Sequence, residues 1–69
     1  MIIVDQNGHE HQTHEIMFSG NVVKCVPEND KRKSENLGIY ESCIRAAQIQ
    51  MHIYQAYKEG KIEYVMPKE

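Results

Sequence analysis

The chain has 69 residues, of which 41% are hydrophobic and 26% charged, and its formal net charge is −2 at pH 7. This length predicts a single domain over residues 1–69 and excludes a multidomain enzyme or a large nucleotide-binding fold. The composition is typical of a globular chain, and the nearly balanced charge provides no basic field to attract nucleic acid.

The compartment is inferred from what the sequence lacks. The first residues carry neither the basic segment nor the apolar segment of a secretory signal, and no run approaches the roughly eighteen apolar residues of a membrane span. Two cysteines, Cys25 and Cys43, are fewer than a small secreted domain usually carries. We expect a cytoplasmic protein with reduced thiols and no membrane segment.

The first third of the chain carries strand and turn signals. Asn7-Gly8 is the dipeptide typical of a type I′ hairpin turn, and Gly20-Asn21 is a second turn between apolar segments. Pro27 cannot donate to a strand ladder and ends the run. We expect three antiparallel strands at about residues 2–5, 9–18 and 22–26.

The two turns predict registers that conflict in the middle strand. Around Gly20-Asn21, Phe18 would face Val23 and Ile16 would face Cys25, which points even-numbered residues of that strand inward. Around Asn7-Gly8, Val4 would face His11, which points odd-numbered residues inward. One extra residue restores the alternation, so we predict a β-bulge or break between about residues 11 and 15.

A polar, charge-dense loop is expected at residues 27–34, followed by one long helix. Ser34 is a candidate N-cap and Gly60 a natural residue after the helix end, which predicts a helix over about residues 35–59. Residues 62–66 alternate as a short final strand. The predicted fold class is α+β: a small antiparallel meander, a long amphipathic helix and a C-terminal strand.

The predicted helix is apolar on two flanks, because its polar residues fall in one narrow stripe. A 25-residue helix would be about 37 Å long, against about 17 Å for a five-residue strand, so the sheet would leave part of it uncovered. We therefore expect a homodimer or another protein partner on the exposed flank. The expected interface residues are Leu37, Tyr40, Ile44, Ala47, Met51 and Tyr54. A shorter or kinked helix that folds wholly onto its own sheet is the alternative.

A histidine-rich segment follows the first turn. His9 and His11 are two residues apart on a strand and would point to the same side, where imidazoles can chelate Zn²⁺ or Ni²⁺. His14 would lie on the other face unless the predicted bulge turns it, and Cys25 or Cys43 could add a thiolate. The alternative is that these side chains occupy the solvated face of a hairpin.

No pattern in the sequence predicts an enzyme. Cys43 and His52 would lie about 13.5 Å apart along one helix and on different faces, so they cannot form a nucleophilic dyad within one chain. Asp5 and Glu10 would face each other across the first hairpin, both exposed, with no pocket to raise a pKa. No catalytic residue and no resident cofactor are therefore expected.

These observations predict a non-enzymatic binding or regulatory protein that acts through protein–protein contacts. Small single-domain chains of this type include inhibitors and accessory proteins carried by phages and mobile elements. A small metal-binding regulator with histidine ligands is one alternative. A weak nucleic-acid-binding module, based on Lys31-Arg32-Lys33 and Arg45, is the second alternative.

Overall fold

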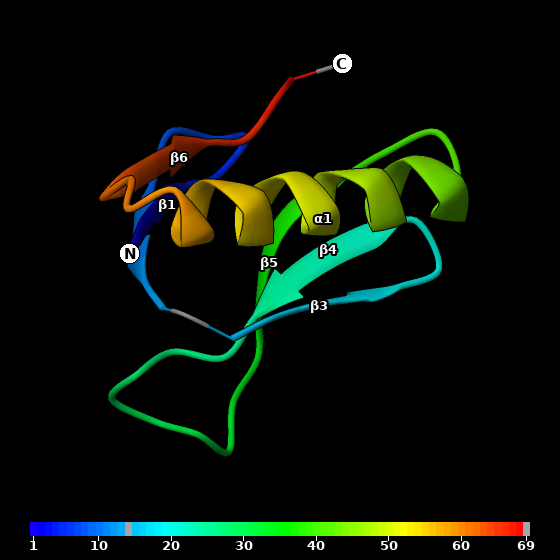
Figure 1. Ribbon diagram of the computed structural model, residues 1–69. Coiled ribbons are helices and arrows are strands. Elements are labelled where there is room, and N and C mark those ends of the chain that lie inside the picture. Colours follow the sequence, from blue (N-terminus) through cyan, green and yellow to red (C-terminus); the bar gives the residue numbers. More distant parts are fainter. Residues whose placement is uncertain (14, 69) are drawn as a thin grey trace.

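Within residues 1–13 and 15–68, which the computed structural model describes, the chain forms six strands and one helix (Figure 1). This arrangement confirms the α+β class, with antiparallel N-terminal strands, one helix and a short C-terminal strand. In chain order the elements are β1 (Ile2–Val4), β2 (Glu10–Gln12), β3 (Ile16–Ser19), β4 (Val22–Cys25), β5 (Glu35–Ile39), α1 (Cys43–Lys58) and β6 (Glu63–Val65).

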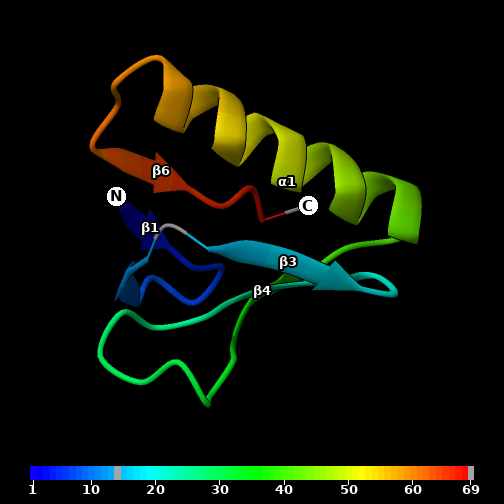
Figure 2. The same ribbon diagram turned by 60° about the horizontal axis from the view of Figure 1, so that its bottom comes forward.

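The strands form two three-stranded sheets instead of one meander. The first sheet has the order β2-β1-β6, in which β1 runs antiparallel to β2 and parallel to β6. The second sheet has the order β3-β4-β5 and is antiparallel throughout. Helix α1 lies over the second sheet, and β6 returns beside the C-terminal part of the helix (Figure 2).

The register of the second hairpin is confirmed. Ile16 pairs with Cys25 and Phe18 with Val23, as the pattern around Gly20-Asn21 predicts. Gly20 has φ of +58° and Asn21 does not have a positive φ. A positive φ at only the first central residue is typical of a type II′ turn, which matches the right-handed twist of the strands.

The register of the first hairpin differs from the prediction by one residue. Ile3 pairs with His11 and Val4 with Glu10, because the turn is a three-residue loop over residues 6–8. Only Gly8 adopts a positive φ, +88°, and its N–H donates to the Asp5 carbonyl at 3.0 Å. The type I′ assignment is therefore wrong. The loop is a tight turn closed by a left-handed glycine.

The predicted break in the middle strand is confirmed. Strand β2 ends at Gln12 and β3 begins at Ile16, and between them the chain passes from the first sheet to the second. Thr13 is buried and so is Ile16, so the inward-facing positions change from odd to even numbers across this segment. His14 lies outside the described residues.

The predicted start of the helix is wrong, because residues 35–39 form strand β5. Glu35 pairs with Cys25 and Ile39 with Val22, so this segment satisfies the free edge of β4. The N-cap is Ser42, whose hydroxyl accepts from the Arg45 N–H at 3.1 Å, and not Ser34. Asn36 and Gly38 are both poor helix formers, which is consistent with this choice.

The end of the helix is close to the prediction. Gly60 has φ of +80°, its N–H donates to the Tyr57 carbonyl, and the Lys61 N–H donates to the Ala56 carbonyl, both at 3.1 Å. These two bonds form a Schellman motif. The helix has 16 residues, a length of about 24 Å. The predicted length of 25 residues is therefore wrong.

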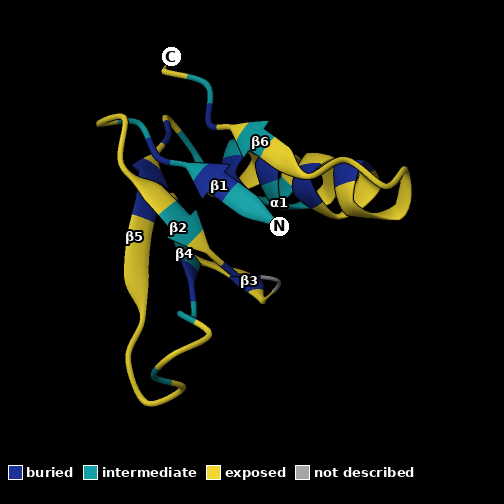
Figure 3. Cartoon of the chain, turned by 90° about the vertical axis from the view of Figure 1, so that its left-hand side faces the viewer, coloured by how far each residue is buried: buried dark blue, intermediate teal, exposed yellow. Residues whose placement is uncertain are grey.

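The core lies between α1 and the two sheets. The helix contributes Ala46, Ile49, Ile53 and Ala56, which are all buried. The buried apolar side chains from the rest of the chain are Ile3, Ile16, Val23, Cys25, Leu37, Tyr40 and Met66. Figure 3 shows that the outer side of the helix and most of the loop between β4 and β5 remain exposed. In the described part of the chain, no helix is long and apolar enough to cross a membrane.

Gly8 provides a test of the first turn. No atom lies within 4 Å of a Cβ added at this position, so a substitution there strains only the backbone. We expect Gly8→Val to lower the free energy of unfolding by about 1–2 kcal/mol in urea denaturation, because a β-branched residue disfavours positive φ. Gly8→Asn is the matched control and should lose less, since asparagine tolerates this conformation. Equal stability of the valine variant and the parent would contradict the turn described above.

Candidate functional site

Side chains of the types that bind metal ions lie together where the two sheets meet. Asp5 follows β1, His11 lies on β2, Cys25 ends β4 and Glu35 begins β5. The first two come from one sheet and the last two from the other, where Cys25 and Glu35 are direct partners in the β4–β5 ladder. We call these four residues the junction cluster.

His11 lies between two carboxylates. Its Nε2 is 2.7 Å from Asp5 Oδ2, and its Nδ1 is 3.1 Å from Glu35 Oε1. The side chains of Asp5 and His11 are only 7% and 12% exposed, whereas that of Glu35 is 47% exposed. The cluster is therefore buried at the Asp5 end and open to solvent at the Glu35 end.

Asp5 also organises the first turn. Its Oδ1 accepts from the backbone N–H groups of Asn7 at 2.8 Å and His9 at 2.9 Å. Burial alone would raise the pKa of Asp5, but the hydrogen bond with His11 and these two backbone donors outweigh it and lower the pKa. The prediction that Asp5 is exposed opposite Glu10 is wrong, because Asp5 is buried and pairs with His11 instead.

Asp5 and Glu35 also affect the pKa values of His11 and Cys25. Burial acts to lower the pKa of His11, but hydrogen bonds to Asp5 and Glu35 and their charges outweigh it and raise the pKa. Burial, together with the negative charges of Glu35 and Asp5, raises the pKa of the Cys25 thiol to about 11. Cys25 is a free thiol, and this pKa does not favour its use as a nucleophile at neutral pH.

The predicted histidine pair is only partly brought together. His9 and His11 do lie on the same side of the hairpin, since both rings approach Asp5 Oδ2, His9 Nδ1 at 3.9 Å. The His9 side chain is 79% exposed, however, and the described residues that could share a metal ion are His11, Cys25 and Glu35. The sequence pattern includes Cys25 as a possible thiolate ligand but not Glu35, because residue 35 falls within the predicted helix.

The predicted interface residues divide into two groups. Leu37 and Tyr40 are buried in the core and precede the helix, so the assignment of these two residues to an exposed helix flank is wrong. The other four lie on α1, and we call them the outer row: Ile44, Ala47, Met51 and Tyr54. Ile44 and Met51 are 70% and 69% exposed.

One end of the outer row is anchored to the sheet. The Tyr54 hydroxyl donates to the Ile16 carbonyl at 3.0 Å, and Gln50 Nε2 donates to the same carbonyl at 2.9 Å. These bonds fix the rotation of α1 against β3. The opposite flank, with Ala46, Ile49 and Ile53, therefore faces the sheet, and Ile44 and Met51 of the outer row face away from it.

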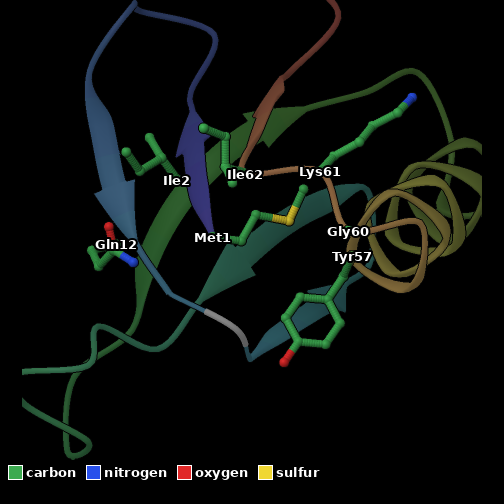
Figure 4. A pocket seen from close by; sticks show the side chains of 7 residues that line it. All are labelled: Met1, Ile2, Gln12, Tyr57, Gly60, Lys61 and Ile62. Carbon is green, nitrogen blue, oxygen red and sulfur yellow. The ribbon is translucent and has the colours of Figure 1, made fainter.

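A shallow hollow of about 330 Å³ lies between the end of α1 and the first sheet (Figure 4). In Figure 4 the Tyr57 ring lies near Met1, and the Lys61 side chain extends away from them. Lys61 Nζ is 3.5 Å from Glu59 Oε1. Met1, Ile2, Ile62 and Tyr57 contribute apolar surface to the hollow, and Gln12 and Lys61 contribute its polar side chains.

The basic triplet does not form a concentrated positive surface. Residues 31–33 are exposed in the loop between β4 and β5, and Arg32 Nε lies 3.6 Å from Asp30 Oδ1. Arg45 lies on the helix, where its Nη1 donates to Gln48 Oε1 at 3.3 Å. The triplet and Arg45 therefore lie on separate elements of the chain.

No family model, curated protein or solved structure matches the chain significantly. The function is therefore argued from the geometry of this chain alone.

Asp5 is the residue on which the junction should depend most. Asp5→Ala leaves two backbone N–H groups and one imidazole nitrogen without their acceptor, so we expect the free energy of unfolding to fall by about 2–3 kcal/mol. Urea denaturation at neutral pH measures this loss. Glu10→Ala removes an exposed carboxylate from the same hairpin and should change stability by no more than about 0.5 kcal/mol. Equal losses in the two variants would contradict the structural role of Asp5.

Proposed function

We propose that this chain is a non-enzymatic binding or regulatory protein that works as a homodimer. The observation that carries the proposal is the outer row of α1, in which Ile44 and Met51 expose about 70% of their surface although they lie beside a packed core. Large apolar side chains aligned on one exposed helix face are typical of an interaction surface.

The order of side-chain sizes along the outer row favours the binding of a second copy of the chain on this surface. If two α1 helices pack antiparallel through their outer rows, with the two-fold axis crossing the helix at the height of residue 49, Ile44 of one copy lies opposite Tyr54 of the other. Ala47 then lies opposite Met51. A small side chain facing a long one, and a branched one facing an aromatic one, allow the surfaces to interdigitate, as an isologous interface requires.

Size supports the same proposal. A chain of 69 residues forms a small core, and oligomerisation is a common way for such chains to gain stability. A stable dimer buries about 800 Å² per subunit, which is roughly a sixth of the 4611 Å² surface of this chain. The outer row would supply the apolar centre of such an interface, and Arg45, Gln48 and Gln55 would form its polar rim.

Further exposed apolar side chains could bind a target protein. Ile39, Ile62 and Val65 are 60%, 80% and 61% exposed, and they lie outside α1. In this proposal the dimer acts sterically on a protein target, as an inhibitor or accessory protein of the kind that phages carry. The two free cysteines are consistent with a reducing, cytoplasmic location.

Sedimentation equilibrium at micromolar concentration tests the proposal. We expect the parent chain to be dimeric and Ala47→Glu to be monomeric, because the substitution buries a charge at the closest helix contact. His52→Glu introduces the same charge at an exposed helix position outside the proposed interface and should remain dimeric. A parent chain that is monomeric while it retains a cooperative thermal transition would contradict the proposal, as would an Ala47→Glu variant that stays dimeric.

A further inference from the structure

The junction cluster contains the donor types that zinc binds in proteins. These are one imidazole from His11, one thiol from Cys25 and one carboxylate from Glu35. One ligand atom from each residue lies within 4.8 Å of the other two. We propose that His11, Cys25 and Glu35 form a Zn²⁺ site that joins the two sheets, with Asp5 holding the ring of His11. The site is independent of the dimer proposed above.

The distances within the cluster are close to those of a coordination sphere. In a tetrahedral site with bonds of about 2.0 Å, nitrogen and oxygen ligands are about 3.3 Å apart. His11 Nδ1 and Glu35 Oε1 are 3.1 Å apart. A sulfur at about 2.3 Å from zinc lies about 3.5 Å from the other ligands. The ligand atoms of the cluster lie within 4.8 Å of one another, so the Cys25 Sγ distances need to shorten by at most about 1.3 Å.

Asp5 supplies the outer support that zinc-binding histidines usually have. A ligating imidazole commonly donates its second ring N–H to a carboxylate, which fixes the tautomer and the orientation of the ring. Asp5 Oδ2 lies 2.7 Å from His11 Nε2, and two backbone N–H groups hold the other carboxylate oxygen in place. This arrangement assigns Nδ1, on the side of Glu35, as the metal-binding nitrogen.

The negative charges around the cluster and the opening beside it are suited to a bound cation. Glu35 and Asp5 place two carboxylates around the site. Binding of Zn²⁺ would release the protons of the Cys25 thiol and of His11 Nδ1 to solvent, and the divalent ion offsets the negative charge of the resulting thiolate. Cys25 is fully buried, but Glu35 is half-exposed. A hollow of about 380 Å³, bounded by His11, Glu28 and Glu35 among others, opens beside the cluster. It gives the ion a route from solvent and leaves room for water as a fourth ligand.

The site differs from the surface histidine pair suggested by the sequence. That pair uses His9 and His11 on one hairpin, whereas the junction site uses residues from both sheets. Matched controls for two of its ligands exist within the chain. His9 is an exposed histidine on the same side of the hairpin as His11, and Cys43 is an exposed free cysteine.

Calorimetric titration of tag-free, chelator-treated protein with Zn²⁺ tests the site directly. We expect one ion per chain at micromolar metal and a thermal midpoint that rises with metal concentration. His11→Gln and Glu35→Gln should each weaken binding at least about tenfold, and Asp5→Asn about 10-fold to 100-fold. His9→Gln and Cys43→Ser should leave the affinity unchanged. Glu35 is half-exposed, so the Glu35→Gln variant tests the site even if a variant of a buried ligand fails to fold.

Cobalt substitution identifies the sulfur ligand. Co²⁺ bound through Cys25 should give a thiolate charge-transfer band in the near ultraviolet, retained in Cys43→Ser and lost in Cys25→Ser. The absence of binding heat and of a thermal shift at micromolar Zn²⁺ would overturn the proposal. So would loss of binding in His9→Gln but not in His11→Gln, which would indicate a surface chelate, or loss of the cobalt band in Cys43→Ser.

Discussion

The buried carboxylate of Asp5 is the interaction on which the junction of the two sheets depends. One oxygen closes the first turn through two backbone N–H groups, and the other orients His11 toward the second sheet. A carboxylate side chain that is 7% exposed is costly to bury unless its hydrogen bonds are satisfied, and here both oxygens have partners. The Asp5 side chain therefore shapes the first turn, the contact between the two sheets and the arrangement of the potential metal ligands.

Gln6 extends the same junction. Its side-chain Oε1 accepts from the Ile39 N–H at 2.8 Å, and its Nε2 donates to the carbonyl of Pro67 at 2.9 Å. A Cβ at Gly38 would lie 2.8 Å from Gln6 Cδ, so only glycine allows this approach. The turn thus binds β5 and the C-terminal segment together. Helix α1 covers one sheet face with four buried side chains, and Ile44 and Met51 of its outer row stay exposed.

The candidate sites could be predicted only in part. His11 was a candidate ligand because histidines two residues apart share a strand face, and that reasoning needs no long-range information. Glu35 could not be found, since its sequence separation from His11 is 24 residues and the segment that carries it also fits a helical pattern. Spacings of three and four residues link Leu37, Tyr40 and Ile44, so periodicity alone extended the helix through β5.

Local interactions are sufficient to specify four features: the α+β class, the register of the β3–β4 hairpin, the break after β2 and the helix end at Gly60. Each depends on turn chemistry or side-chain alternation within a few residues. Long-range contacts, in contrast, set the strand at residues 35–39 and the division of the strands into two sheets, because the free edge of β4 takes its hydrogen-bond partners from residues distant in sequence. The first turn, which carries the buried Asp5, also packs on β5, where the Gln6 N–H donates to the Leu37 carbonyl at 3.0 Å.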